Sequence, residues 1–212
     1  MRRSVILRSE DASAEKKAAN PLDIGFYGRP FRGERVSGDA TVVARREGLA
    51  FVAMIDVLGH GQEASVLASH IKAFLDRDWG ANVTDTMMRL HQDIKGSRGA
   101  AAGLAVVDER AGELRYCGVG NTVLRRVGTR PTRLISREGV IGQQMRSPQQ
   151  QNLNLGPSDV VLLYTDGVSD RFEVDQYPQL LYESAMSIAR TVVQRFGKAH
   201  DDATCLALRY QP

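Results

Sequence analysis

Runs of Val, Leu, Ile and Ala alternate along this chain with short polar or glycine-bearing turns. Apolar runs of this length, bounded by turn residues, are typical of β-strands. They predict strands at residues 23–27, 40–45, 49–55, 103–108, 114–118, 122–127, 160–165 and 204–209. The turns at residues 46–48 and 109–112 are short and contain glycine, which predicts antiparallel hairpins.

Three other segments place apolar residues three or four positions apart, which is the spacing of one helix face. They are residues 64–75, 87–94 and 180–196. Strands outnumber helices, and the helices follow or separate groups of strands. This order favours an α+β layered sandwich, with antiparallel sheets and helices on the outer faces, over a doubly wound parallel sheet.

The N-terminal part of the chain differs from the rest. Residues 9–20 contain no large apolar side chain and therefore cannot bury much surface. We expect residues 1–21 to form an N-terminal arm or extra strand with a flexible linker. Residues 22–212 show no repeat and no second linker, and we expect them to form one folded domain.

Composition excludes several classes of protein. The 28 basic and 25 acidic residues give a net charge of +3 without a long basic block, so we expect no nucleic-acid partner. The longest apolar run, residues 49–55, is far shorter than the roughly 20 residues of a membrane-spanning helix. The N-terminal apolar stretch is too short for a signal-peptide core. Cys117 and Cys205 make no disulfide framework and suit a reducing compartment. We therefore expect a cytoplasmic protein that does not bind membranes.

Aspartates stand at the ends of four predicted strands. They are Asp39, Asp56, Asp166 and the neighbours Asp201 and Asp202. An unpaired charge at the end of a buried strand is costly, and converging carboxylates repel one another unless a cation lies between them. A cluster of oxygen ligands without His or Cys is what Mg²⁺ or Mn²⁺ prefers. On position alone, the alternative that these aspartates form turns and helix caps stays open.

Four short motifs, in this order along the chain, carry a resemblance to a known family. They are Ser37-Gly38-Asp39, residues 56–61 (DVLGHG), residues 163–170 (LYTDGVSD) and residues 201–204 (DDAT). Together they resemble the metal-dependent PPM (type 2C) serine/threonine phosphatases, and within these the sporulation-stage-II-E branch. The resemblance covers roughly residues 22–210. The compact size of the chain, with no sensor or kinase-like domain attached, looks most like the stressosome feedback phosphatases of that branch.

This resemblance implies an αββα sandwich of two antiparallel sheets flanked by helices, with a metal site at one end. Asp56 would bridge two Mn²⁺ or Mg²⁺ ions, and the backbone carbonyl of Val57 would join one of them. Asp166 and Asp201 would complete the shell, and Asp39 would bind directly or through water. Asp56, Asp166 and Asp201 would then act in catalysis through metals that activate a water molecule.

Three features depart from the family pattern. Val57 stands where these motifs usually have Gly, and a β-branched residue narrows the allowed backbone. His60 lies four residues after Asp56, whereas eukaryotic type 2C enzymes carry their proposed general-acid histidine two residues after it, so we expect a structural role for His60. Neither Arg32 nor Arg35 matches the eukaryotic phosphate-binding arginine in spacing. We therefore expect the metals to hold most of the substrate phosphate.

The function implied by the resemblance is removal of phosphate from phosphoserine or phosphothreonine of bacterial stress-signalling proteins. The partners would be phosphorylated STAS-domain scaffold or anti-sigma-antagonist proteins, and we expect the enzyme itself to be a monomer. Two alternatives stay open. One is a non-catalytic phosphoprotein-binding module, against which the retained aspartates argue. The other is a hydrolase of a small phosphate ester, which only a comparison of substrates would separate from a protein phosphatase.

Overall fold

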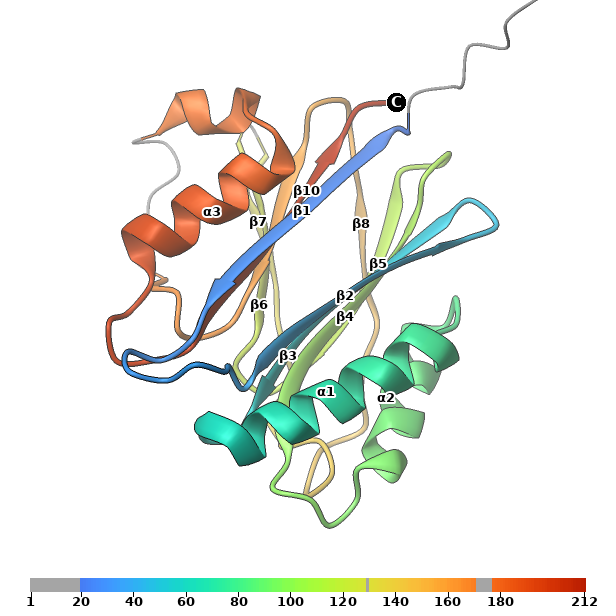
Figure 1. Cartoon of the computed structure of the whole chain (residues 1–212). Coiled ribbons are helices and arrows are strands. Elements are labelled where there is room, and N and C mark those ends of the chain that lie inside the picture. Colours follow the sequence, from blue (N-terminus) through green and yellow to red (C-terminus); the bar gives the residue numbers. More distant parts are fainter. Residues whose placement is uncertain (1–19, 129, 171–176) are drawn as a thin grey trace, which may run out of the picture.

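A computed structural model describes residues 20–128, 130–170 and 177–212. These residues form two antiparallel sheets packed face to face, with helices on both outer faces (Figure 1). The αββα sandwich expected from the sequence is confirmed. Most of the expected N-terminal arm, residues 1–19, lies outside the described residues.

The first sheet has the strand order β1-β10-β9-β6-β7. Its strands are β1 (Leu22–Arg29), β6 (Val123–Val127), β7 (Thr132–Leu134), β9 (Val160–Tyr164) and β10 (Ala203–Tyr210). Helix α3 (Ala185–Phe196) covers the outer face of this sheet, after a 3₁₀ helix, η2 (Pro178–Tyr182). The sequence predicts one helix over residues 180–196, but the Ser184 side chain accepts a hydrogen bond from Ser187 N and starts α3 anew.

The second sheet has the strand order β2-β3-β4-β5-β8. Its strands are β2 (Asp39–Arg46), β3 (Leu49–Val57), β4 (Ala100–Asp108), β5 (Glu113–Val119) and β8 (Gln151–Asn154). Helices α1 (Gly61–Asp78) and α2 (Val83–Asp93) cover its outer face. The two predicted hairpins, β2–β3 and β4–β5, are confirmed as antiparallel pairs.

Strand β3 shows how the apolar runs build both layers of the core. Phe51, Ala53 and Ile55 belong to the cluster beneath α1 and α2, whereas the alternate residues Val52 and Met54 belong to the cluster between the sheets. Successive side chains of a strand point to opposite faces, and both faces of this strand are buried. A strand of this kind has a continuous apolar sequence, which explains the run at residues 49–55.

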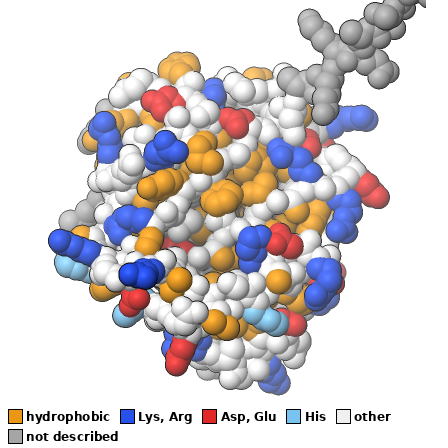
Figure 2. Space-filling view, in the orientation of Figure 1, with side chains coloured by type: hydrophobic (Ala, Val, Ile, Leu, Met, Phe, Trp, Pro, Cys, Tyr) orange, Lys and Arg blue, Asp and Glu red, His pale blue; other side chains and the backbone are white. Residues whose placement is uncertain are grey.

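The two sheets leave their first strands, β1 and β2, as edge strands on the same side of the sandwich. Figure 2 shows hydrophobic side chains gathered in the middle of this face, with charged side chains around them. Phe26 of β1 is 44% exposed. No helix in the described part of the chain is both long and apolar enough to cross a membrane. Cys117 and Cys205 are buried core residues, and burial raises the pKa of both thiols.

Candidate metal centre

The topology brings the four aspartate motifs to one end of the sandwich. In the second sheet, Asp39 at the start of β2 lies directly opposite Asp56 of β3 in the antiparallel ladder. In the first sheet, Asp166 follows β9 and Asp201 precedes β10. These two strands are antiparallel neighbours, so the end of β9 and the start of β10 lie together.

Hydrogen bonds through Thr165 join the two sheets at this end. The Thr165 hydroxyl donates to Asp39 Oδ2 at 3.0 Å and accepts from Thr204 N at 3.2 Å. Thr165 N in turn donates to Thr204 O at 3.1 Å. Thr165, which lies at the end of β9 and directly before Asp166, therefore orients a carboxylate of the second sheet.

Asp201 and Asp202 have different surroundings although they are neighbours in sequence. Asp202 is buried, and its two carboxylate oxygens accept hydrogen bonds from Phe31 N at 2.6 Å and Gly38 N at 2.8 Å. It therefore anchors the loop before β2 to the start of β10. Asp201 is only partly buried, and the hydrogen bond that acts on its carboxylate comes from the backbone of Asp202. The strand begins after both, at Ala203.

Glycines allow the close approach of these motifs. Gly59 and Gly61 have φ values of 83° and 79°, which let the chain turn from β3 into α1. A Cβ on Gly167 would lie 1.7 Å from the backbone oxygen of Asp202, so only glycine brings the Asp166 turn this near. Val57 is a strand residue whose N–H donates to Gly38 O at 3.2 Å, a backbone conformation that suits a β-branched side chain.

The carboxylates interact electrostatically. Burial, and then the charges of Asp166, Asp201 and Asp202, raise the pKa of Asp56 to about 7. Burial and the charge of Asp56 hold the pKa of Asp39 well above its ordinary value, although hydrogen bonds from Thr204 and Thr165 oppose this.

The pKa of Asp201 is also raised, by burial and by Asp166, while Lys198 acts in the opposite direction. No Lys or Arg of the described residues forms an ion pair with Asp39, Asp56, Asp166 or Asp201. This end of the sandwich therefore carries negative charge that the protein itself leaves largely uncompensated.

Asn121 is a site residue that the sequence analysis missed. Its Nδ2 donates to Asp166 Oδ2 at 2.6 Å. The sequence suggests only a turn between two strands at residues 118–121, but this turn carries the chain from β5 in one sheet to β6 in the other. Because the crossing occurs at the aspartate end, it places Asn121 beside Asp166. A cavity of about 310 Å³ lies there, lined by both residues and by Lys198.

His60 lies at the margin of the centre, just before α1. Its ring stacks on Phe31 with 4.8 Å between centroids, and its Nδ1 lies 3.2 Å from Glu34 Oε1. These contacts connect α1 to the loop that Asp202 anchors. They agree with the structural role expected for His60, which stays a prediction. Arg32 and Arg35 lie exposed on the same loop.

The donor set fits a hard divalent cation by its chemistry. In residues 20–128, 130–170 and 177–212, no three His, Cys, Asp or Glu side chains already stand in an arrangement that would hold an ion. The four aspartates nevertheless offer oxygen donors only, and burial, together with repulsion between carboxylates, raises the pKa of Asp56 and Asp39. Oxygen donors with uncompensated charge are what Mg²⁺ and Mn²⁺ prefer.

Comparison with known proteins identifies the family. Residues 46–211 match the family described as Stage II sporulation protein E (SpoIIE). The chain belongs to the SpoIIE family. Family members are PP2C-type serine/threonine protein phosphatases, which are metal-dependent, so the resemblance seen in the sequence is confirmed at this level.

Three solved structures illustrate the fold of this SpoIIE-family phosphatase. One comes from work on the bacterial stressosome as a modular system adapted to control secondary messenger signalling. It is 26% identical in sequence with a TM-score of 0.82, and the match covers 89% of this chain and 99% of that chain. The structure of RsbX in complex with magnesium is 18% identical in sequence with a TM-score of 0.77, and the match covers 90% of this chain and 96% of that chain. The PP2C domain of SpoIIE from Bacillus subtilis, with a fragment of its regulatory domain, is 15% identical with a TM-score of 0.71, over 90% and 62%.

Proposed function

We propose that this chain is a Mn²⁺- or Mg²⁺-dependent phosphatase that removes phosphate from phosphoserine or phosphothreonine of stress-signalling proteins. The convergence of four aspartate motifs at one end of a SpoIIE-family fold carries this proposal. The likeness to RsbX and to a stressosome structure supports a place in stress signalling. STAS-domain or anti-sigma-antagonist proteins are the proposed partners, and the enzyme would act in the cytoplasm as a monomer.

The proposed metal ligands are Asp39, Asp56, Asp166 and Asp201, together with the backbone carbonyl of Val57. Two cations, when bound, would activate water and offset the negative charge of the phosphoryl group. Thr165 holds Asp39, and Asn121 holds Asp166, in fixed orientations. Asp202 keeps the loop before β2 in place through two backbone N–H groups.

Substitution of Asp56 tests the proposal. Asp56→Asn removes the central charge, so hydrolysis of a phosphoprotein and of p-nitrophenyl phosphate should fall by several orders of magnitude. Rates are measured with Mn²⁺, with Mg²⁺ and with a chelator, and circular dichroism checks the fold. Near-normal Mn²⁺-dependent turnover in this variant would refute the metal assignment.

The same assay separates the alternatives. A wild-type protein that binds phosphoproteins but hydrolyses no substrate with either metal would be a binding module. A protein that hydrolyses small esters far better than any phosphoprotein would be a small-ester hydrolase.

A further inference from the structure

A cavity of about 450 Å³ opens at the end of the sandwich opposite the aspartates. Arg209 of β10 and Ser158, just before β9, contribute its polar lining, while Val127 and Leu181 contribute apolar surface. Asp166 and Asp201 adjoin the other ends of β9 and β10. Since β9 alone spans five residues, about 17 Å or more separates this cavity from the proposed metal centre.

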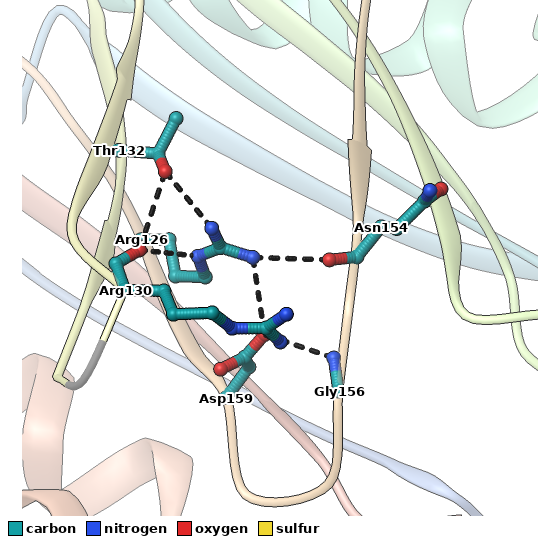
Figure 3. Close-up of polar contacts among 6 residues, drawn as sticks. All are labelled: Arg126, Arg130, Thr132, Asn154, Gly156 and Asp159. Atoms are coloured by element: carbon teal, nitrogen blue, oxygen red, sulfur yellow. Dashed lines mark hydrogen bonds and ion pairs between the residues drawn. The ribbon is translucent and has the colours of Figure 1, made fainter.

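The carboxylate of Asp159 borders the cavity, and one of its two oxygens already has three partners. Its Oδ2 accepts from Gly156 N at 2.8 Å, from Arg126 Nη1 at 3.3 Å and from Arg130 Nη2 at 3.2 Å (Figure 3). Arg126 is held further by the backbone oxygens of Asn154 and Arg130. Two guanidinium groups thus share one buried carboxylate.

The guanidinium group of Arg209, in contrast, has no carboxylate partner among the described residues. Within the described residues, its Nε is buried without a hydrogen-bond partner, and its side chain forms no ion pair. Asp23 lies opposite Arg209 in the β1–β10 ladder, but the Asp23 carboxylate accepts a hydrogen bond from Ala185 N at the start of α3. A buried donor without a partner is unfavourable, and the rest of the Arg209 guanidinium lines the cavity without a carboxylate partner among the described residues.

The chemistry around Arg209 defines that ligand. A guanidinium group offers adjacent N–H donors in one plane, which match the two oxygens of a carboxylate or phosphate. Of the described residues that line the cavity, Arg209 carries the positive charge, and the Asp159 carboxylate is already paired with Arg126 and Arg130. The guanidinium of Arg209 is therefore the group that an anion would meet. The volume is within the usual range for a small-molecule site.

We propose that this cavity binds a small organic anion. Its carboxylate or phosphate group pairs with the guanidinium of Arg209, and its apolar body packs against Val127 and Leu181. The Ser158 hydroxyl lies in the same lining and offers a further donor. This site is separate from the proposed metal centre and does not depend on the phosphatase activity.

The test uses the full chain in chelator, so that no bound metal attracts the anion. Benzoate is the probe with a carboxylate, and phenylphosphonate is the probe with a phosphate-like group. Inorganic phosphate lacks the apolar body, and benzyl alcohol lacks the charge. Melting temperature and the amide shifts of ¹⁵N-labelled protein are followed during each titration. Benzoate or phenylphosphonate should raise the melting temperature saturably, and the stronger of the two identifies the preferred head group.

Three variants locate the binding. Arg209→Gln should weaken it at least tenfold, and Arg209→Lys should weaken it less, because lysine keeps the charge but not the paired donors. Arg115→Gln is the matched control. The Nε of Arg115 is also buried without a hydrogen-bond partner. Arg115 does not line this cavity, however, and its Nη1 donates to Ala81 O. This variant should bind as the wild type does.

Several outcomes would overturn the proposal. One is that Arg209→Gln and Arg115→Gln bind the anion equally well. Another is that benzyl alcohol or inorganic phosphate binds as tightly as benzoate or phenylphosphonate. The third is that no probe binds saturably. Amide shifts in the wild type provide evidence that needs no variant. They should cluster at residues 127–128, 158–159 and 181–182, and a cluster elsewhere would place the anion at another site.

Discussion

At the residue scale, Asp201 and Asp202 should respond differently to substitution. Asp201→Ala removes a proposed metal ligand, so activity should be abolished while the free energy of unfolding changes little. Asp202→Ala leaves Phe31 N and Gly38 N without their acceptor, so it should lower the free energy of unfolding by about 3 kcal/mol. Asp202→Asn keeps one acceptor oxygen and should fall between Asp202→Ala and the wild type.

Urea unfolding and phosphatase assays measure the two effects separately. At temperatures where the variants stay folded, Asp202→Ala should retain far more activity than Asp201→Ala. The opposite ranking of activity would mean that Asp202, not Asp201, faces the metals.

Asn121 gives a second prediction at this scale. Its 2.6 Å hydrogen bond orients Asp166, so Asn121→Ala should weaken Mn²⁺ binding about 10- to 100-fold, as is usual for partners of metal ligands. The bond lies at the surface, so the melting temperature of the metal-free protein should hardly change. Asn152→Ala, which removes an exposed bond to Gln150, is the matched control. Unchanged Mn²⁺ affinity in Asn121→Ala would exclude this positioning role.

At the scale of elements, the turn after β9 should tolerate no side chain at Gly167. A Cβ there would overlap the Asp202 carbonyl at 1.7 Å, so Gly167→Ala should lower the free energy of unfolding by about 3 kcal/mol or more. The control is Gly48→Ala in the β2–β3 hairpin, where φ is 77° but no atom lies within 4 Å of the added Cβ. That variant should lose only about 1 to 2 kcal/mol, from backbone strain. If urea unfolding gave the same loss of free energy for Gly167→Ala and Gly48→Ala, the close approach at Gly167 would not destabilise the variant.

The elements differ in how well the sequence predicts them. Strand β3 is apolar throughout because both of its faces are buried, so its position is evident. Strands β7 and β8 are short, polar and at sheet edges, where little burial constrains their residues, and the sequence analysis missed both. The four aspartate motifs are visible in the sequence, but the pairing of Asp39 opposite Asp56 depends on strand register. The contact of Asn121 with Asp166 depends on a crossing between sheets, which no local pattern reports.

At the scale of the molecule, metal binding should stabilise the fold in a pH-dependent way. With the folded-state pKa of Asp56 raised to about 7, the metal-free protein loses stability as pH rises from about 4 towards 7, because the unfolded chain ionises first. Mn²⁺ competes with that proton and binds only the folded state. The increase in melting temperature caused by Mn²⁺ should therefore be larger at pH 8 than at pH 5.5. An increase that is absent, or equal at both pH values, would show that the carboxylates do not share an ion.

Substrate choice also belongs to the whole molecule. Two cavities, of about 310 and 340 Å³, border the proposed centre, and both are smaller than the cavity of about 450 Å³ at the other end of the sandwich. Affinity should then come from contacts with a folded partner that position its phosphate. A phosphorylated STAS-domain protein should have a kcat/KM far above that of a phosphopeptide with the same site, whereas Asp56→Asn should abolish both. Equal kcat/KM for protein and peptide would argue against partner docking while leaving the phosphatase chemistry intact.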